Sequence, residues 1–186
     1  MQYFERQNDS LLFRLNGETV MVSPWGEDSL RTRAALFNEL SDNSPALLSP
    51  TKSEPVIELG DELQISYYNQ KGELLLQEIP NGGALFLKAR RFQSLPGDSF
   101  FLTASFVSNP SEKIYGMGQY QQETLNLKGC NLELAHRNSQ ASIPFYVSSL
   151  GYGFLWNNAA VGDVHFGTNT TQWTARSCKQ LDYWIT

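Results

Sequence analysis

Two neighbouring stretches of sequence decide the fold. Residues Lys113–Tyr120 read Lys-Ile-Tyr-Gly-Met-Gly-Gln-Tyr, and residues Ser142–Asn158 read Ser-Ile-Pro-Phe-Tyr-Val-Ser-Ser-Leu-Gly-Tyr-Gly-Phe-Leu-Trp-Asn-Asn. Both consist of short apolar and aromatic runs interrupted by glycine or proline, which is typical of strands joined by tight turns. Neither keeps the 3.6-residue apolar period of an amphipathic helix. We therefore expect β-structure in this part of the chain.

The two glycines of the first stretch, Gly116 and Gly118, resemble a phosphate-binding loop only superficially. The third glycine of a dinucleotide fingerprint is missing, and so are the Gly-Lys-Ser/Thr of a P-loop and a following helix. Glycine also serves where a chain bends or where two backbones approach closely. We interpret the pair as such a bend.

Outward from these stretches, the chain continues as short segments separated by turn residues. Asn16-Gly17 predicts a type I′ hairpin turn, because both central positions of that turn need positive φ. Leu125–Leu134, interrupted by Gly129, predicts a strand with a bulge or bend. The other expected strands are residues 10–15, 18–22, 29–37, 62–68, 73–78, 100–107, 143–149, 153–157, 161–166 and 172–175. This series predicts one all-β domain over residues 1–186, an antiparallel β-sandwich with less than about a tenth of its residues in helices.

Composition excludes several classes of protein. The 186 residues are 41% hydrophobic and 18% charged, which is typical of a globular domain. A net charge of −5, without a Lys/Arg-rich block, gives no reason to bind nucleic acid or an anionic membrane. No apolar run approaches the roughly 20 residues of a membrane span, and the N-terminus has no apolar signal region. We therefore expect a cytoplasmic protein that binds neither nucleic acid nor membrane.

Cysteine and histidine are too scarce for the usual metal sites. Cys130 and Cys178 lie in no C-x-x-C spacing, and His136 and His165 are far apart in sequence. We expect no metal, no cofactor and no disulfide framework. Trp156 and Trp173 could stack on a sugar ring, but packing in the core or between domains is the better interpretation of such large aromatic residues.

The Tyr115–Gln119 segment and the Ile143–Gly153 segment together resemble the N-terminal domain of the family 31 glycoside hydrolases, the α-glucosidases and α-xylosidases. The resemblance is dense in motifs from about Tyr115 onward. It implies a galactose-mutarotase-like β-sandwich, or supersandwich, that precedes a catalytic (β/α)8 barrel of the same polypeptide. The barrel is absent from these 186 residues.

The resemblance also implies a contribution to substrate binding. In the family, the loop after the Leu132-Glu133-Leu134 strand reaches over the barrel mouth, which assigns His136, Arg137, Asn138 and Gln140 as candidate substrate-binding residues. Imidazole, guanidinium and amide groups suit sugar hydroxyls, although composition alone favours an ordinary solvated loop. The implied substrate is an α-linked glucoside or xyloside oligosaccharide.

No catalytic residue can be assigned in this chain. Retaining glycosidases need an acid and a nucleophile about 5–5.5 Å apart. The nearby carboxylates are Glu133, Asp163 and Asp182, whereas the family takes both catalytic aspartates from barrel strands. We expect a non-catalytic domain that is inactive alone.

Two other functions stay open. A stand-alone carbohydrate-binding module would need no barrel, and a mutarotase-type epimerase would have only His136 and His165 for its histidines. If a barrel does follow, we expect an apolar docking patch, with the candidates Tyr115, Met117, Tyr120, Trp184 and Ile185.

Overall fold

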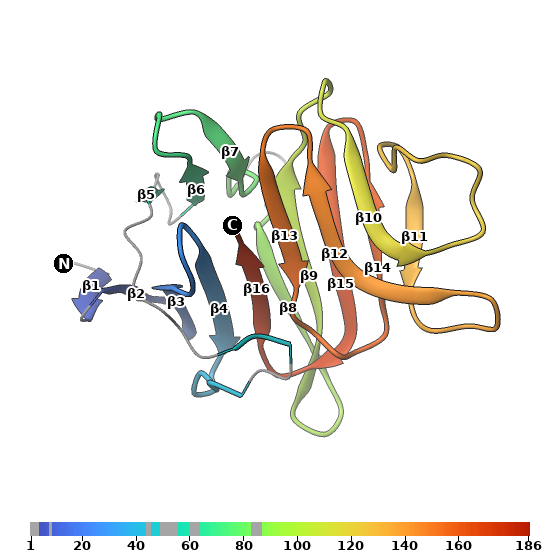
Figure 1. The fold of residues 1–186 in the computed structure, drawn as a ribbon. Coiled ribbons are helices and arrows are strands. Elements are labelled where there is room, and N and C mark those ends of the chain that lie inside the picture. The colour runs from blue at the N-terminus through green and yellow to red at the C-terminus, as the bar shows by residue number, and fades with distance from the viewer. Residues whose placement is uncertain (1–3, 8, 44–45, 49–55, 60–63, 83–86) are drawn as a thin grey trace.

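The computed structural model describes residues 4–7, 9–43, 46–48, 56–59, 64–82 and 87–186. All regular secondary structure in these ranges is β-strand, paired antiparallel, and none of it is helix (Figure 1). It follows that the described part of the chain holds no helix able to cross a membrane. The expectation of an all-β fold with almost no helix is confirmed.

The strands are short and follow one another closely along the sequence. Their bounds are β1 Phe4–Gln7, β2 Ser10–Leu15, β3 Glu18–Pro24, β4 Leu30–Leu36, β5 Val56–Leu59, β6 Ile65–Tyr68, β7 Leu74–Gln77, β8 Arg90–Leu95, β9 Ser99–Val107, β10 Ile114–Gln119, β11 Asn131–Leu134, β12 Ala141–Ser148, β13 Tyr152–Trp156, β14 Gly162–Phe166, β15 Thr170–Cys178 and β16 Leu181–Ile185. The expected strand at 62–68 begins at Ile65 here, and residues 62 and 63 lie outside the described ranges.

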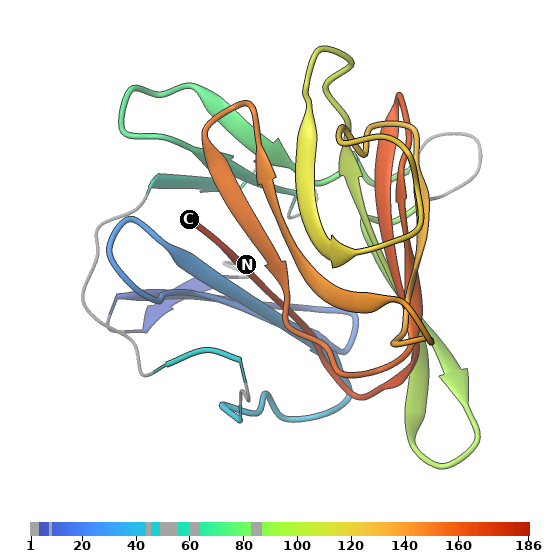
Figure 2. The same ribbon diagram turned by 45° about the vertical axis from the view of Figure 1, so that its right-hand side comes forward.

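The strands form a sandwich of two layers. One layer is an eight-stranded sheet in the order β1-β2-β3-β4-β16-β13-β12-β10. The facing layer is a five-stranded sheet, β11-β14-β15-β9-β8, and the β5-β6-β7 sheet lies beside it (Figure 2). A bridge between Glu78 and Phe106 joins the end of β7 to β9. The antiparallel β-sandwich predicted from the sequence is confirmed.

Aromatic side chains fill the space between the layers. Tyr146, Phe154 and Tyr183 come from the eight-stranded sheet, and Trp173 comes from the five-stranded sheet. The Phe154 ring stacks on Trp173 at 5.2 Å and on Tyr183 at 5.2 Å between centroids. Trp156, which is 1% exposed, stacks on Trp173 at 5.5 Å. Both tryptophans are therefore core residues, which was the preferred interpretation of the sequence, and neither is available to a sugar.

The Gly-Met-Gly segment of β10 bends against β12. Gly116, Met117 and Gly118 all have positive φ, at 119°, 66° and 91°. A Cβ on Gly118 would lie 2.2 Å from the carbonyl oxygen of Ala141 and one on Gly116 would lie 2.8 Å from that of Phe145, so both positions require glycine. The predicted bend with close backbone approach is confirmed.

The bend decides where neighbouring side chains point. The register between β10 and β12 shifts so that Ile143, Pro144 and Phe145 lie opposite the single residue Met117. Pro144 thus lies inside the strand at a bulge, rather than at the strand start or edge that its missing N–H suggests. Met117 is fully buried, and Ile185 is 4% exposed. The expectation that these two residues belong to an exposed docking patch was wrong.

One turn prediction and one strand prediction had different outcomes. Asn16 and Gly17 have φ of 53° and 82°, as a type I′ turn requires, between β2 and β3. The strand expected over Leu125–Leu134 is confirmed only for its last four residues, which form β11, and was wrong for residues 125–130. The Leu127 N–H donates to the carbonyl oxygen of Ile114, Gly129 has a φ of 85°, and Leu125 is 79% exposed. Those residues form a projecting loop.

Charged residues are buried on the outer face of the eight-stranded sheet, over β4 and β16. The Arg31 guanidinium makes a bidentate pair with Asp182, from Nε to Oδ1 at 3.0 Å and from Nη2 to Oδ2 at 2.6 Å. The Trp25 ring covers Arg31 at 4.4 Å, and Arg33 bonds the Ser41 carbonyl oxygen. We call Arg31, Arg33 and Asp182, with Trp25, Ser41 and Asp42 over them, the covered half.

Candidate functional site

The four candidate binding residues lie in one tight connection between β11 and β12. The N–H of Gln140 donates to the Arg137 carbonyl oxygen at 3.0 Å, and the reverse bond is 3.4 Å long. Ser139 adopts a φ of 66°, the left-handed conformation that closes such a turn. The connection is therefore a two-residue turn with Asn138 and Ser139 at its tip. It projects beside the end of the sandwich (Figure 1).

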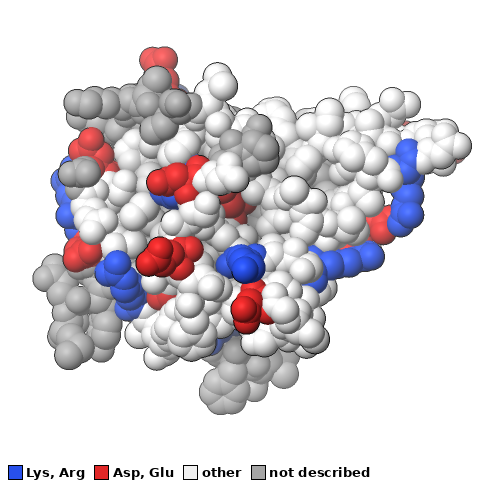
Figure 3. Space-filling model, turned by 90° about the horizontal axis from the view of Figure 1, so that it is seen from below, with Lys and Arg blue, Asp and Glu red and all other residues white. Residues whose placement is uncertain are grey.

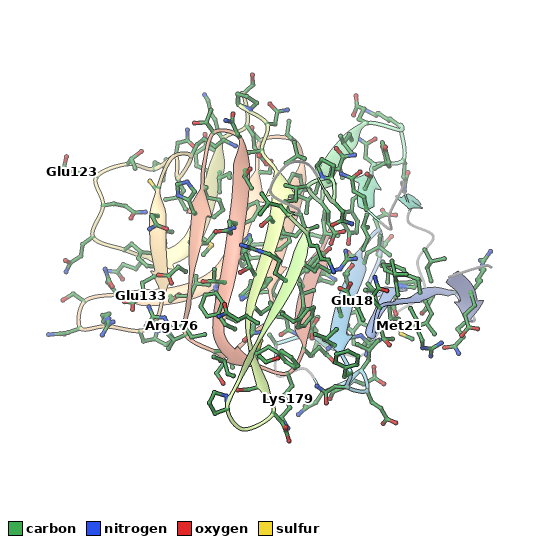
Figure 4. All side chains as sticks on the ribbon, turned by 180° about the vertical axis from the view of Figure 1, so that it is seen from behind. Glu18, Met21, Glu123, Glu133, Arg176 and Lys179 are labelled. Carbon is green, nitrogen blue, oxygen red and sulfur yellow. The ribbon has the colours of Figure 1, made fainter. Side chains whose placement is uncertain are left out.

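An ion cluster holds one side of this turn. Arg137 donates to Glu133 through Nε at 3.0 Å and through Nη2 at 2.7 and 2.8 Å. Arg176 on β15 reaches Glu133 at 3.4 Å and Asp163 on β14 at 3.7 Å. Figure 4 shows Glu133 and Arg176 near each other at this end, and Figure 3 shows acidic side chains between basic ones there. Hydrogen bonds from Arg137 and the nearby charges lower the pKa of Glu133.

The other candidates are held less tightly. His136 accepts the Ser142 N–H at its Nδ1, at 3.3 Å, and its side chain is exposed. Asn138 is exposed at the tip, and no other described residue bonds its amide. Gln140 is half-buried where β12 begins. The turn thus presents an imidazole and an amide to solvent, two groups that can bond sugar hydroxyls.

Sequence reasoning missed the residues that position the turn. The Tyr120 hydroxyl donates to the Glu133 carbonyl oxygen at 2.9 Å and accepts from the Ser142 hydroxyl at 2.7 Å, so it joins β11 to β12. Arg176 comes from a strand 36 residues after the turn's last residue, Gln140. The four-residue spacing of Glu133 and Arg137, which both precede the tip of the turn, was the one local signal. Nothing local pointed to Arg176 or Tyr120.

Each of the three carboxylates considered for catalysis lies within reach of an arginine. Asp182 is buried in its pair with Arg31, and burial raises the pKa of Asp182 despite that partner. Glu133 and Asp163 are cross-strand neighbours, but Arg176 reaches both of them. The lowered pKa of Glu133 is the opposite of what a general acid needs.

Hollows in the surface lie away from the turn. One of about 540 Å³ is lined by residues near the ends of β2, β3 and β8, including Asn16, Glu18 and Arg90. A second, of about 210 Å³, includes Arg91, His165 and Gln172. Residues 136–140 line neither hollow. Within the described ranges, no three His, Cys, Asp or Glu side chains are grouped so as to hold a metal ion.

The fold and these motifs agree with one family model. Residues 13–164 match the glycosyl hydrolase 31 N-terminal galactose mutarotase-like domain. The chain belongs to glycoside hydrolase family 31. The match includes β10, the 136–140 turn and β12, which are the segments that carried the resemblance in the sequence.

Relatives within family 31 support the assignment over the whole chain. An uncharacterized family 31 glucosidase from Pseudescherichia vulneris is 41% identical over 96% of the chain, and α-xylosidase A of Aspergillus niger is 26% identical over 98%. The crystal structure of a family 31 α-xylosidase from a soil metagenome, complexed with xylose, covers the whole chain at 42% identity with a TM-score of 0.94.

The chain spans only part of the length of these relatives. It covers 40% of the Pseudescherichia glucosidase, 30% of the Aspergillus α-xylosidase and 32% of the soil-metagenome α-xylosidase. Each of these relatives therefore contains a large part that has no counterpart in the 186 residues.

Proposed function

We propose that residues 1–186 form the single, non-catalytic N-terminal domain of a retaining α-glycosidase. The proposed enzyme hydrolyses α-linked xylosides or glucosides, with its catalytic pair in a following (β/α)8 barrel. One observation carries this proposal. The whole chain matches a structure of an α-xylosidase complexed with xylose at 42% identity, yet its own candidate carboxylates are tied to arginines. The cytoplasmic location expected from the sequence stays part of the proposal.

Within that enzyme, the 136–140 turn completes the sugar pocket from outside the barrel. His136 and Asn138 offer exposed groups to sugar hydroxyls, with Gln140 at the base of the turn. Arg137 acts chiefly by holding the turn, because Glu133 already engages its guanidinium at two nitrogens. A turn closed by backbone bonds and an ion pair presents its tip in one geometry, which lowers the entropic cost of binding.

The test is a comparison of Asn138→Ala with Asn169→Ala in the full-length enzyme, assayed on aryl α-xylosides and α-glucosides. Asn169 is a matched control, because it is an exposed asparagine in the β14–β15 turn. One lost hydrogen bond to a sugar is worth about 0.5–1.5 kcal/mol, so Asn138→Ala should lower kcat/KM about 2- to 10-fold. Melting temperatures should not change in either variant.

Three results would count against the proposal. Equal kcat/KM values in the two variants would mean that the turn is an ordinary solvated loop without contact to the sugar. Glycosidase turnover by residues 1–186 alone, abolished by changing Glu133, Asp163 or Asp182, would overturn the non-catalytic assignment. A gene without barrel-forming sequence after Thr186 would favour the stand-alone carbohydrate-binding module instead.

A further inference from the structure

The two surface hollows meet at β8, the edge strand of the five-stranded sheet, and they share two basic side chains. The first hollow lies where β8 approaches the β2–β3 hairpin, and the second lies on the outer face of the sheet. Lys88 and Arg91 line both hollows. The first alone, at about 540 Å³, is within the range of about 300–1,000 Å³ that is typical of ligand sites. We call the two hollows, joined at Lys88 and Arg91, the basic groove.

Arg91 has no partner within the described part of the chain. Successive side chains of a strand point to opposite faces, so Arg90 is buried whereas its neighbour Arg91 is exposed. Other arginines each pair with a carboxylate, namely Arg14, Arg31, Arg33, Arg90, Arg137 and Arg176. Among the described residues, none forms an ion pair or a hydrogen bond with the side chain of Arg91 or of Lys88. Both cations are therefore available to a ligand.

The lining of the groove carries an excess of positive charge. Glu18 is the only carboxylate among its described lining residues, and Glu18 already accepts the Arg90 Nε–H at 2.7 Å. In Figure 4, which looks onto the five-stranded sheet, Glu18 lies beside β8. Lys88 and Arg91 therefore form a positive region on a chain whose net charge is −5. A guanidinium group binds a carboxylate through two parallel hydrogen bonds, so the groove suits a ligand with a carboxylate.

The second hollow adds a row of hydrogen-bonding groups across three neighbouring strands. His165, Gln172 and Ser105 lie opposite one another on β14, β15 and β9. Because neighbouring strands are about 4.8 Å apart, the row extends over roughly 10 Å. The Gln172 Nε2 donates to the Ser105 Oγ at 3.3 Å, which orients the amide, and the His165 side chain is exposed. Imidazole, amide and hydroxyl groups in such a row suit the hydroxyls of a sugar.

We propose that the basic groove binds an acidic oligosaccharide, with a sugar carboxylate against Arg91 and Lys88 and sugar hydroxyls along the row of His165 and Gln172. An inorganic anion would pair with the two cations but leave the row unused. A neutral sugar would use the row but leave the cations unpaired. A saccharide with a uronic acid unit does both. The groove is separate from the 136–140 turn, whose residues line neither hollow, so this inference does not depend on the proposed function.

The experiment is titration calorimetry of the full-length protein with three probes: xylotriose carrying one glucuronic acid unit, plain xylotriose and inorganic phosphate. The acidic probe should bind most tightly. Arg91→Gln should weaken its binding about tenfold or more, because charge-assisted bidentate bonds are the strong ones, and Arg91→Lys should restore only part of the affinity. Lys88→Gln should weaken binding as well. Lys179→Gln is the matched control, because Lys179 is an exposed lysine between β15 and β16 that lines neither hollow, and its affinity should equal that of wild type.

Each other outcome overturns the inference. If Arg91→Gln and Lys88→Gln bind the acidic probe as wild type does, the probe binds elsewhere and the groove is ordinary surface. If plain xylotriose binds as tightly and responds equally to Arg91→Gln, the groove is a site for neutral sugars. If phosphate binds as tightly as the acidic probe, the groove holds simple anions only. Melting temperatures of the variants should equal that of wild type, because both side chains are exposed. Failure of the proposed function is distinguishable, because it appears as absent turnover and not as a change in binding at Arg91.

Discussion

The outer face of the eight-stranded sheet has two unlike halves. The covered half buries Arg31 under the Trp25 ring and pairs it with Asp182. The other half is the open face, the outward side chains Tyr115, Phe145, Val147, Leu155 and Trp184, which exposes Val147 and carries no charge. The two halves meet at β16, where Trp184 lies opposite Arg31. A buried charge needs its partner within the same folded unit, because an unpaired one costs several kcal/mol. Apolar side chains can stay partly exposed without such a cost. The covered half is therefore fully paired within the described chain, whereas the open face keeps apolar side chains exposed to solvent.

The largest expected effect comes from breaking the covered half. Asp182→Ala leaves the Arg31 guanidinium buried without its carboxylate, which should cost about 3–5 kcal/mol of unfolding free energy. Asp163→Ala is the control, because Asp163 is 44% exposed and 3.7 Å from Arg176. Asp163→Ala should change the free energy of unfolding by no more than about 0.5 kcal/mol. Urea unfolding of residues 1–186 measures both. Similar midpoints for the two variants would mean that the covered half contributes little.

A second comparison separates core from open face across β10 and β12. Met117 is fully buried, so Met117→Ala should leave a cavity and cost about 2–5 kcal/mol. Val147→Ala should change the stability of residues 1–186 by no more than about 0.5 kcal/mol, because that side chain is half exposed. Denaturant midpoints again give the result. If Met117→Ala lowers the midpoint no more than Val147→Ala does, Met117 is not a core residue, and the docking role expected from the sequence would again apply to it.

The smallest expected effect lies at the turn and concerns protonation. Because Arg137 lowers the pKa of Glu133, the ion pair contributes above the ordinary Glu pKa and is lost as pH falls through the lowered value. Arg137→Ala should move the pKa of Glu133 upward, toward its usual range. Carboxyl NMR titration of the two proteins measures the shift. An unchanged pKa would mean that Arg176, not Arg137, holds Glu133.

Local pattern determined much of this protein. Asn16-Gly17 dictated a type I′ turn by sterics at two residues, and Gly116 and Gly118 dictated a bend for the same reason. The turn containing His136, Arg137, Asn138 and Gln140 was recognisable as one polar connection, and its chemistry suits sugars. Its contact with substrate stays a prediction. Leu125–Leu134 was misread because its leucines alternate like a strand, although Leu127 instead packs a loop against β10.

Tertiary structure alone decided which side chains meet and which face is left open. Arg31 and Asp182 are 151 positions apart, and only the pairing of β4 with β16 brings them together. The bulge opposite Met117 turned that residue inward, whereas Val147, in the same strand pair, points outward. Sequence periodicity shows which residues of a strand share a face. When both faces are apolar, it does not predict which face is buried. That choice is made by the register with which distant strands pair.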